Sequence, residues 1–158
     1  MPTIFRAILA LLLVAAGPAA FAPEQFFVGR TEGVGTVQVI MSGKHGVRVQ
    51  SRGRIDRGGA LLLEQVVEEE GKPRRIRSWR LVRSGANQIT GTLSDARGPV
   101  TGEVTGNVLH IRYRATEGPA VEQWITMLPG GRVARNRMIF RKFGMKVATV
   151  EETIRRVD

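Results

Sequence analysis

Histidine is the residue type in this sequence best suited to acid–base catalysis, and there are two of them. His45 stands in the turn-like sequence Gly-Lys-His-Gly, and His110 falls on a strand position that alternation predicts to face solvent. No serine has the Gly-x-Ser-x-Gly setting that exposes the nucleophile of an α/β-hydrolase. The sequence therefore predicts no serine-hydrolase triad.

Metal and nucleotide chemistry have equally little support. With two histidines and no cysteine, a three-ligand zinc site would need carboxylates from distant strands. The run Glu68-Glu69-Glu70 alternates sides if it lies on a strand, so we interpret it as a solvated hairpin end rather than a calcium site. No glycine-rich phosphate loop precedes a helix. We predict no catalytic residue, no metal and no cofactor, and hence a protein that is not an enzyme.

A group of polar residues is predicted to face the interior of a sheet. If Trp79 points inward then Arg77 does too, and if Leu62 and Val66 point inward then so does Glu64 between them. Because a lone buried charge costs several kcal/mol, such residues must pair with one another or hold the polar head of a ligand.

Asn136 is predicted to face the same interior from a later strand, because it shares a face with Met138 and Phe140. We expect Leu109 and Ile111 to line the same interior. The predicted ligand-binding residues are Glu64, Arg77, Trp79, Tyr113, Trp124, Asn136, Met138 and Phe140.

Short strands are the elements that would position these residues. Period-two alternation, broken by Gly, Pro, Asn or Asp, predicts strands over residues 34–41, 46–55, 60–69, 74–82, 87–93, 100–105, 108–115, 121–128, 133–141 and 146–154. The predicted fold is all-β, a single antiparallel up-and-down barrel of about 8–10 strands, with a two-sheet sandwich as the alternative. A barrel of that size encloses side chains or one small ligand.

An uncharged apolar run, residues 7–16, follows Arg6 and precedes Ala20-Phe21-Ala22. This layout is typical of a secretory signal peptide with an Ala-x-Ala cleavage site. We predict a signal peptide over residues 1–22 and a single domain over residues 23–158, with cleavage after Ala19 or a retained anchor as alternatives. The protein is then periplasmic or secreted.

The chain carries 24 Lys and Arg against 14 Asp and Glu, a net charge of +10. Such a charge favours anionic partners. Nucleic acid is not predicted, because the protein is exported and its sparse aromatic residues are not interleaved with arginines. Anionic lipid fits better, which implies peripheral contact with a membrane; alternatively, the charge serves solubility alone.

Five segments resemble a family of small bacterial envelope proteins known only as a domain of unknown function, many of them lipoproteins. They are residues 26–29, 77–79, 91–95, 98–107 and 136–144, and the last two are the most specific. The resemblance implies a lipocalin-type barrel and an envelope location, and it carries over no activity. This chain lacks the cysteine that bears lipid in the lipoprotein members.

Together these observations predict a non-enzymatic binding module for a small hydrophobic or amphipathic ligand or an anionic lipid. The alternative is a solid structural barrel that docks an acidic partner through an outer arginine face. That face comprises Arg48, Arg52 and Arg54, with Arg112 and Arg114 as further members.

Overall fold

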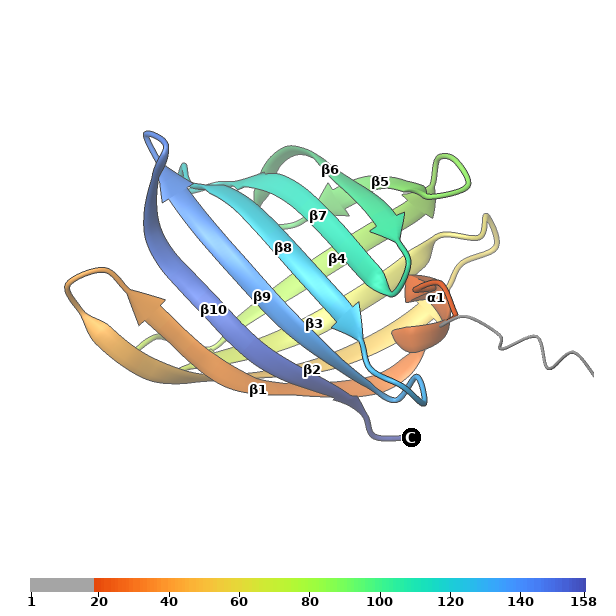
Figure 1. The fold of residues 1–158 in the computed structure, drawn as a ribbon, viewed down its shortest axis with the longest axis horizontal. Helices are drawn as coiled ribbons and strands as arrows, with labels where there is room; N and C mark the ends of the chain where they lie inside the picture. Colours follow the sequence, from red (N-terminus) through yellow and green to blue (C-terminus); the bar gives the residue numbers. More distant parts are fainter. Residues whose placement is uncertain (1–18) are drawn as a thin grey trace, which may run out of the picture.

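Ten antiparallel strands follow one another along the chain and curl into a barrel (Figure 1). The computed structural model describes residues 19–158. The strands are β1 (Gly29–Val39), β2 (Gly43–Ile55), β3 (Leu61–Glu69), β4 (Arg75–Arg83), β5 (Gln88–Leu93), β6 (Ala96–Thr105), β7 (Val108–Ala115), β8 (Ala120–Met127), β9 (Val133–Lys142) and β10 (Met145–Arg156).

The barrel is closed because β1 pairs with β2 on one side and with β10 on the other. Closure satisfies the backbone hydrogen bonds that an open sheet leaves at its edges. The predicted all-β, up-and-down barrel is confirmed, and the sandwich alternative is wrong.

Two strands begin earlier than the sequence predicts. β1 starts at Gly29 rather than residue 34, where three glycines leave the alternation without apolar markers. β6 starts at Ala96 rather than residue 100, and its pairing with β7 shifts register between Arg97 and Thr101. A register shift of this kind breaks the period-two pattern, so alternation alone loses the start of the strand.

One end of the barrel is plugged by the single-turn helix α1 (Pro23–Phe26), which the sequence analysis did not predict (Figure 1). The Ala22 carbonyl accepts hydrogen bonds from the backbone N–H groups of Gln25 and Phe26, both at 3.0 Å. Phe21, Phe26 and Phe27 form a buried aromatic cluster, with the rings of Phe26 and Phe27 edge to face at 4.9 Å. These three side chains close this end of the barrel.

Gly53 on β2 lets this plug approach the wall. A Cβ atom at residue 53 would lie 1.9 Å from the backbone carbonyl oxygen of Phe27. A side chain there would force the backbone apart, since the obstacle is not a flexible side chain. Glycine is thus required by close backbone contact rather than by an unusual turn.

The opposite end carries the hairpins β1–β2, β3–β4, β5–β6, β7–β8 and β9–β10. In Figure 1 the β1–β2 and β9–β10 hairpins project at the left, away from α1 at the right. We call this hairpin end the open end. The core of the predicted leader, residues 7–16, lies outside the described residues. No helix within residues 19–158 is long and apolar enough to cross a membrane.

Candidate ligand-binding cavity

The interior of the barrel holds a cavity of about 580 Å³. This volume lies within the range of about 300–1,000 Å³ that is usual for small-molecule sites. Side chains of the plug end, such as Phe27, Leu63 and Leu109, form its floor, and Lys72, Thr116 and Glu117 lie on its lining at the open end. The barrel is therefore hollow, and the alternative of a solid barrel is wrong.

An apolar wall runs along one side of the cavity. It is built by the inward-facing valines of β1, β2, β3 and β10, namely Val37, Val47, Val49, Val67 and Val150. β-Branched residues at every second position of adjacent strands produce such a smooth surface because they share one face of the sheet. This wall suits the apolar body of a ligand and offers it no hydrogen bond.

A polar belt interrupts the apolar lining in the middle of the barrel. Trp79 Nε1 donates to Gln65 Oε1 at 2.7 Å, and Gln65 Nε2 donates to Ser51 Oγ at 3.2 Å. Gln123 and Asn136 also face the cavity and are buried. Within the described residues, Gln123 Oε1 and Asn136 Oδ1 have no hydrogen-bond partner. Two buried acceptors beside a cavity are free to accept from a ligand.

Glu152 on β10 completes this belt, and the sequence analysis missed it. Asn136 Nδ2 donates to Glu152 Oε2 at 2.8 Å. Gly33 on β1 makes room for the carboxylate, since a Cβ atom there would lie 1.7 Å from Glu152 Oε1. Burial raises the pKa of Glu152 above its ordinary value, although the Asn136 hydrogen bond and the charge of Arg77 oppose this effect. Position 152 falls between the inward residues Val150 and Ile154, so alternation could have found it.

Arg77 on β4 faces the same cavity, as the sequence predicts. Its Nε lies 3.3 Å from Asp95 Oδ2, and its guanidinium carbon lies 5.3 Å from the centre of the Trp79 ring. Tyr113 packs edge to face on Trp79 at 5.8 Å and is buried behind the lining. Burial raises the pKa of the Tyr113 phenol, as does the Asp95 charge, and the charge of Arg77 opposes them. Arg77 is held between a carboxylate and an aromatic ring, which fixes it against the cavity.

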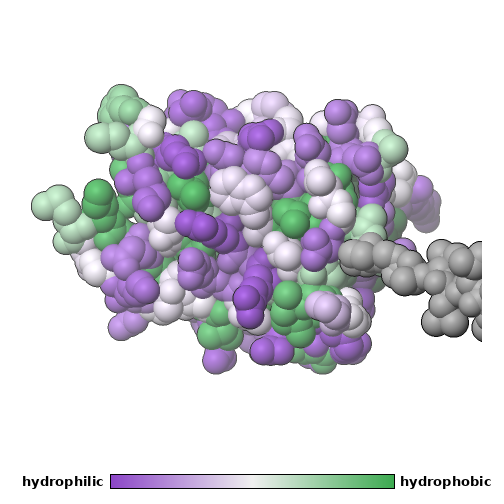
Figure 2. Space-filling model, viewed as in Figure 1, coloured by the Kyte–Doolittle hydropathy of each residue, from purple (hydrophilic) through white to green (hydrophobic). Residues whose placement is uncertain are grey.

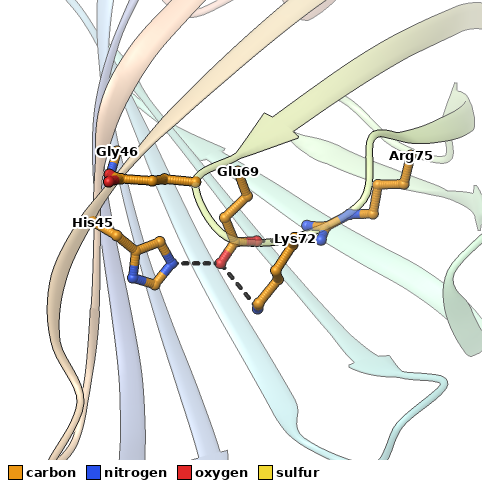
Figure 3. Close-up of polar contacts among 6 residues, drawn as sticks. His45, Gly46, Glu69, Lys72 and Arg75 are labelled. Atoms are coloured by element: carbon orange, nitrogen blue, oxygen red, sulfur yellow. Dashed lines mark hydrogen bonds and ion pairs between the residues drawn. The ribbon is translucent and has the colours of Figure 1, made fainter.

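A second ionic cluster stands at the open end of the cavity (Figure 3). His45 Nε2 and Lys72 Nζ meet the same oxygen of Glu69 at 2.7 and 2.9 Å, and Arg75 reaches the other oxygen at 3.3 Å. Burial alone would raise the pKa of Glu69, but the bonds to His45 and Lys72 and the charges of Lys72 and Arg75 hold it below its usual value. The prediction that Glu69 lies at a solvated hairpin end is wrong, because its side chain is 5% exposed and contacts three basic groups.

Five of the eight predicted ligand-binding residues line the cavity. They are Arg77, Trp79, Asn136, Met138 and Phe140. These come from β4 and β9, where large apolar residues on one face mark the inward side. Whether they bind a ligand stays a prediction.

Glu64 and Trp124 do not reach the cavity, and the prediction that they face inward is wrong. Glu64 is exposed, because Leu61, Leu63 and Val67 of β3 point inward and leave the even positions outside. Trp124 lies on the outer face, where its ring stacks on that of His110 at 4.7 Å and 11°.

With this geometry established, the family of the chain follows from its sequence. A family described as proteins of unknown function, DUF3833, matches residues 14–156. The protein belongs to this family. The resemblance to a family of unknown function and the lipocalin-like barrel are both confirmed. Among curated proteins, none matches this DUF3833 sequence.

A solved structure shares the fold of this DUF3833 protein. It is the S-type phycobiliprotein lyase CPES from Guillardia theta, which superposes with a TM-score of 0.67 at 10% sequence identity. The match covers 85% of this chain and 90% of that chain. At this identity the likeness establishes the shared fold alone.

The expectation that the protein is not an enzyme is corrected by the same neighbour. That expectation came from missing hydrolase, metal and nucleotide motifs. The neighbouring barrel is named a phycobiliprotein lyase, so an enzyme-like function occurs on this fold. We conclude that fold and motif content do not exclude catalysis by the DUF3833 barrel.

The predicted outer arginine face is present, but glutamates of the neighbouring strand lie opposite two of its arginines. Arg48, Arg52 and Arg54 are exposed on β2. In the pairing of β2 with β3, Arg48 lies opposite Glu68 and Arg52 opposite Glu64. This wall of the DUF3833 barrel therefore alternates in sign, which lessens its attraction for an acidic partner.

Replacing Glu152 with Gln should stabilise the DUF3833 protein increasingly as pH rises. Because the folded-state pKa of Glu152 is raised, stability present at low pH is lost as pH rises through that pKa. Glutamine carries no such charge and can still accept from Asn136. Thermal unfolding at about pH 4 and about pH 8 measures the difference, with exposed Glu151→Gln as the control. An equal effect of Glu152→Gln at both pH values would contradict the assignment.

Proposed function

We propose that the barrel binds a small amphipathic molecule. Its polar head lies in the middle of the barrel beside Gln123, Asn136 and Glu152, and its apolar body lies along the valine wall toward the open end. Arg77 contacts the ligand from the opposite side. The proposal is supported by a cavity of about 580 Å³ in which an apolar valine wall lies between this belt and the ionic cluster at the open end.

The observation that carries the proposal is the pair of unpartnered acceptors, Gln123 Oε1 and Asn136 Oδ1. A buried polar atom without a hydrogen bond costs about 1–3 kcal/mol. A ligand group that donates hydrogen bonds, such as a hydroxyl or an N–H, would recover that free energy. The chemistry of the belt therefore favours a donor-bearing head over an aliphatic chain alone.

Filling the cavity should abolish this binding. Ala148 on β10 lines the cavity near the open end, so Ala148→Trp places an indole ring in the space that the ligand needs. The probe is N-phenyl-1-naphthylamine, which combines apolar rings with one N–H donor and fluoresces when it leaves water. We expect Ala148→Trp to weaken probe binding by about tenfold or more, measured by fluorescence titration.

Thr149→Trp is the matched control, because residue 149 is the next position on β10 and points to the other face of the sheet. It should bind the probe like the wild-type protein. Equal binding by the Ala148→Trp variant and the wild type would show that the probe does not occupy the barrel and would defeat the proposal.

The location that we propose is the periplasm or the exterior of the cell. This proposal is supported by the apolar run over residues 7–16 behind Arg6. A hydrophobic ligand in such a compartment exchanges with membranes, because its solubility in water is low. The open end of the barrel is the route by which the ligand enters and leaves.

A further inference from the structure

Two hairpin tips at the open end expose large apolar side chains. On the β1–β2 hairpin, Ile40 is 60% exposed and Met41 is 99% exposed. On the β9–β10 hairpin, Phe143 is 99% exposed and Met145 is 68% exposed. Figure 2 shows hydrophobic colour on both tips at the left, surrounded by a mostly hydrophilic surface. An exposed apolar pair on each of two neighbouring tips is more than the scattered single residues of an ordinary surface.

The backbone at each of these tips is in a conformation that is unfavourable for a large side chain. Met41 has a φ of 64° and Phe143 a φ of 51°, and no other non-glycine residue in 19–158 has a positive φ. For side chains of this kind the left-handed conformation costs roughly 1–2 kcal/mol, and glycine or asparagine is the usual choice. Neither side chain recovers that cost by packing on the barrel, because both are fully in solvent.

The lysines of the chain lie around these tips. The sequence has four lysines among its 24 basic residues, and all four stand at the open end. Lys44 is the second residue of β2, Lys72 lies in the β3–β4 turn, and Lys142 and Lys146 flank the β9–β10 turn. The arginines, by contrast, occur on seven of the ten strands. Lysine combines a flexible apolar stem with a compact charge, which lets it lie along an apolar layer with its ammonium at a phosphate.

The charge of the two tips has one sign. Residues 40–46 and 141–147 contain Lys44, Arg141, Lys142 and Lys146 and no carboxylate. Within the part of the chain that the structure describes, none of these three lysines forms an ion pair. Apolar tips among unpaired lysines are complementary to a surface with anionic headgroups over a hydrocarbon layer.

We propose that the open end docks on an anionic phospholipid bilayer, with the tips of the β1–β2 and β9–β10 hairpins inserted among the headgroups. Lys44, Lys142 and Lys146 bind the lipid phosphates. Docking in this orientation sets the mouth of the cavity against the membrane. The inference goes beyond the proposed ligand binding, since the docking surface lies outside the cavity.

The test is co-sedimentation with vesicles. It uses protein that is expressed from the full-length sequence and purified as the cells process it. Vesicles of phosphatidylcholine with one quarter phosphatidylglycerol are compared with vesicles of phosphatidylcholine alone. We expect binding to the anionic vesicles that falls with added salt. Binding that is equal for the two vesicle types would overturn the proposal.

Met41→Asn with Phe143→Asn removes the most exposed apolar side chain of each tip without loss of the fold, because asparagine tolerates the left-handed conformation. This double variant should melt no lower than the wild type and bind anionic vesicles about tenfold or more weakly. Vesicle binding that persists in the double variant overturns the docking surface. Its binding of N-phenyl-1-naphthylamine in solution should be unchanged, so failure of docking and failure of the cavity proposal are distinguishable.

Lys44→Gln with Lys142→Gln and Lys146→Gln tests the charge. A basic residue near an anionic membrane contributes a factor of about five in affinity, so the triple variant should bind about 100-fold more weakly. Its control is the triple variant Arg48→Gln, Arg52→Gln and Arg54→Gln, which removes equal charge from the exposed wall of β2. An equal loss in both triple variants would attribute binding to net charge and overturn the assignment to the open end.

Discussion

Phe21→Ala should lower the free energy of unfolding by about 3–5 kcal/mol, the usual cost of emptying a buried phenylalanine site. Phe21 is 1% exposed, and its ring lies 5.9 Å from that of Phe26 and 6.5 Å from that of Phe27. Its truncation opens a hole in the plug, which the barrel wall cannot collapse to fill. For a domain of this size the melting temperature should fall by about 10 °C or more, measured by circular dichroism.

Phe143→Ala is the matched control, since the same atoms are removed from a side chain that is 99% exposed. It should leave the melting temperature nearly unchanged. A similar shift in the two variants would mean that the plug adds little to stability, in contradiction to the burial of Phe21.

Alternation predicted the inward residues wherever one face of a strand was clearly apolar. β4 has the order Arg77, Trp79, Leu81 on its inner face, and the two outer residues between them are polar or charged, which indicated its orientation. β9 is similar, with Asn136 carried inward by Met138. In these strands the hydrophobic pattern fixes the register, and the polar residue follows its neighbours.

Alternation predicted the wrong face where both faces of a strand carry apolar residues. β3 contains Leu61, Leu62 and Leu63 in succession, so periodicity could not decide which leucines point inward, and Glu64 was assigned to the wrong face. On β8, Trp124 was predicted to bind the ligand, yet it lies on the outer face and stacks on His110. Cross-strand contacts decide such positions, and a single sequence does not contain them.

The hollow interior and the open end were also beyond prediction from sequence. The strand count permits a packed barrel as well as a hollow one, and the difference depends on how the large side chains tilt. The gathering of the four lysines becomes visible only when the hairpins are placed at one end, because they lie far apart in the chain. The sequence alone therefore predicts the architecture and part of the cavity lining, and the structure adds Glu152 and the docking surface.

The plug also bears on where the predicted leader would be cleaved. Cleavage of the predicted leader after Ala22 would remove Phe21 from the barrel, whereas cleavage after Ala19 would retain it. Retention also preserves the hydrogen bond from the Phe21 N–H to the Gly106 carbonyl and the Ala22 carbonyl that begins α1. We propose cleavage after Ala19, because a chain cut after Ala22 would leave Phe26 and Phe27 without their aromatic neighbour.

A protein that starts at Pro23 should consequently be less stable than one that starts at Ala20 by more than the effect of Phe21→Ala. It loses the Phe21 ring, which alone is worth about 3–5 kcal/mol, and the first hydrogen bonds of α1 as well. Thermal unfolding of the two forms measures the difference, and the intact mass of the protein recovered from its own cells identifies the natural start. A mass that corresponds to a start at Pro23, together with equal stability of the two forms, would contradict this prediction. The barrel would then keep its closed end without Phe21.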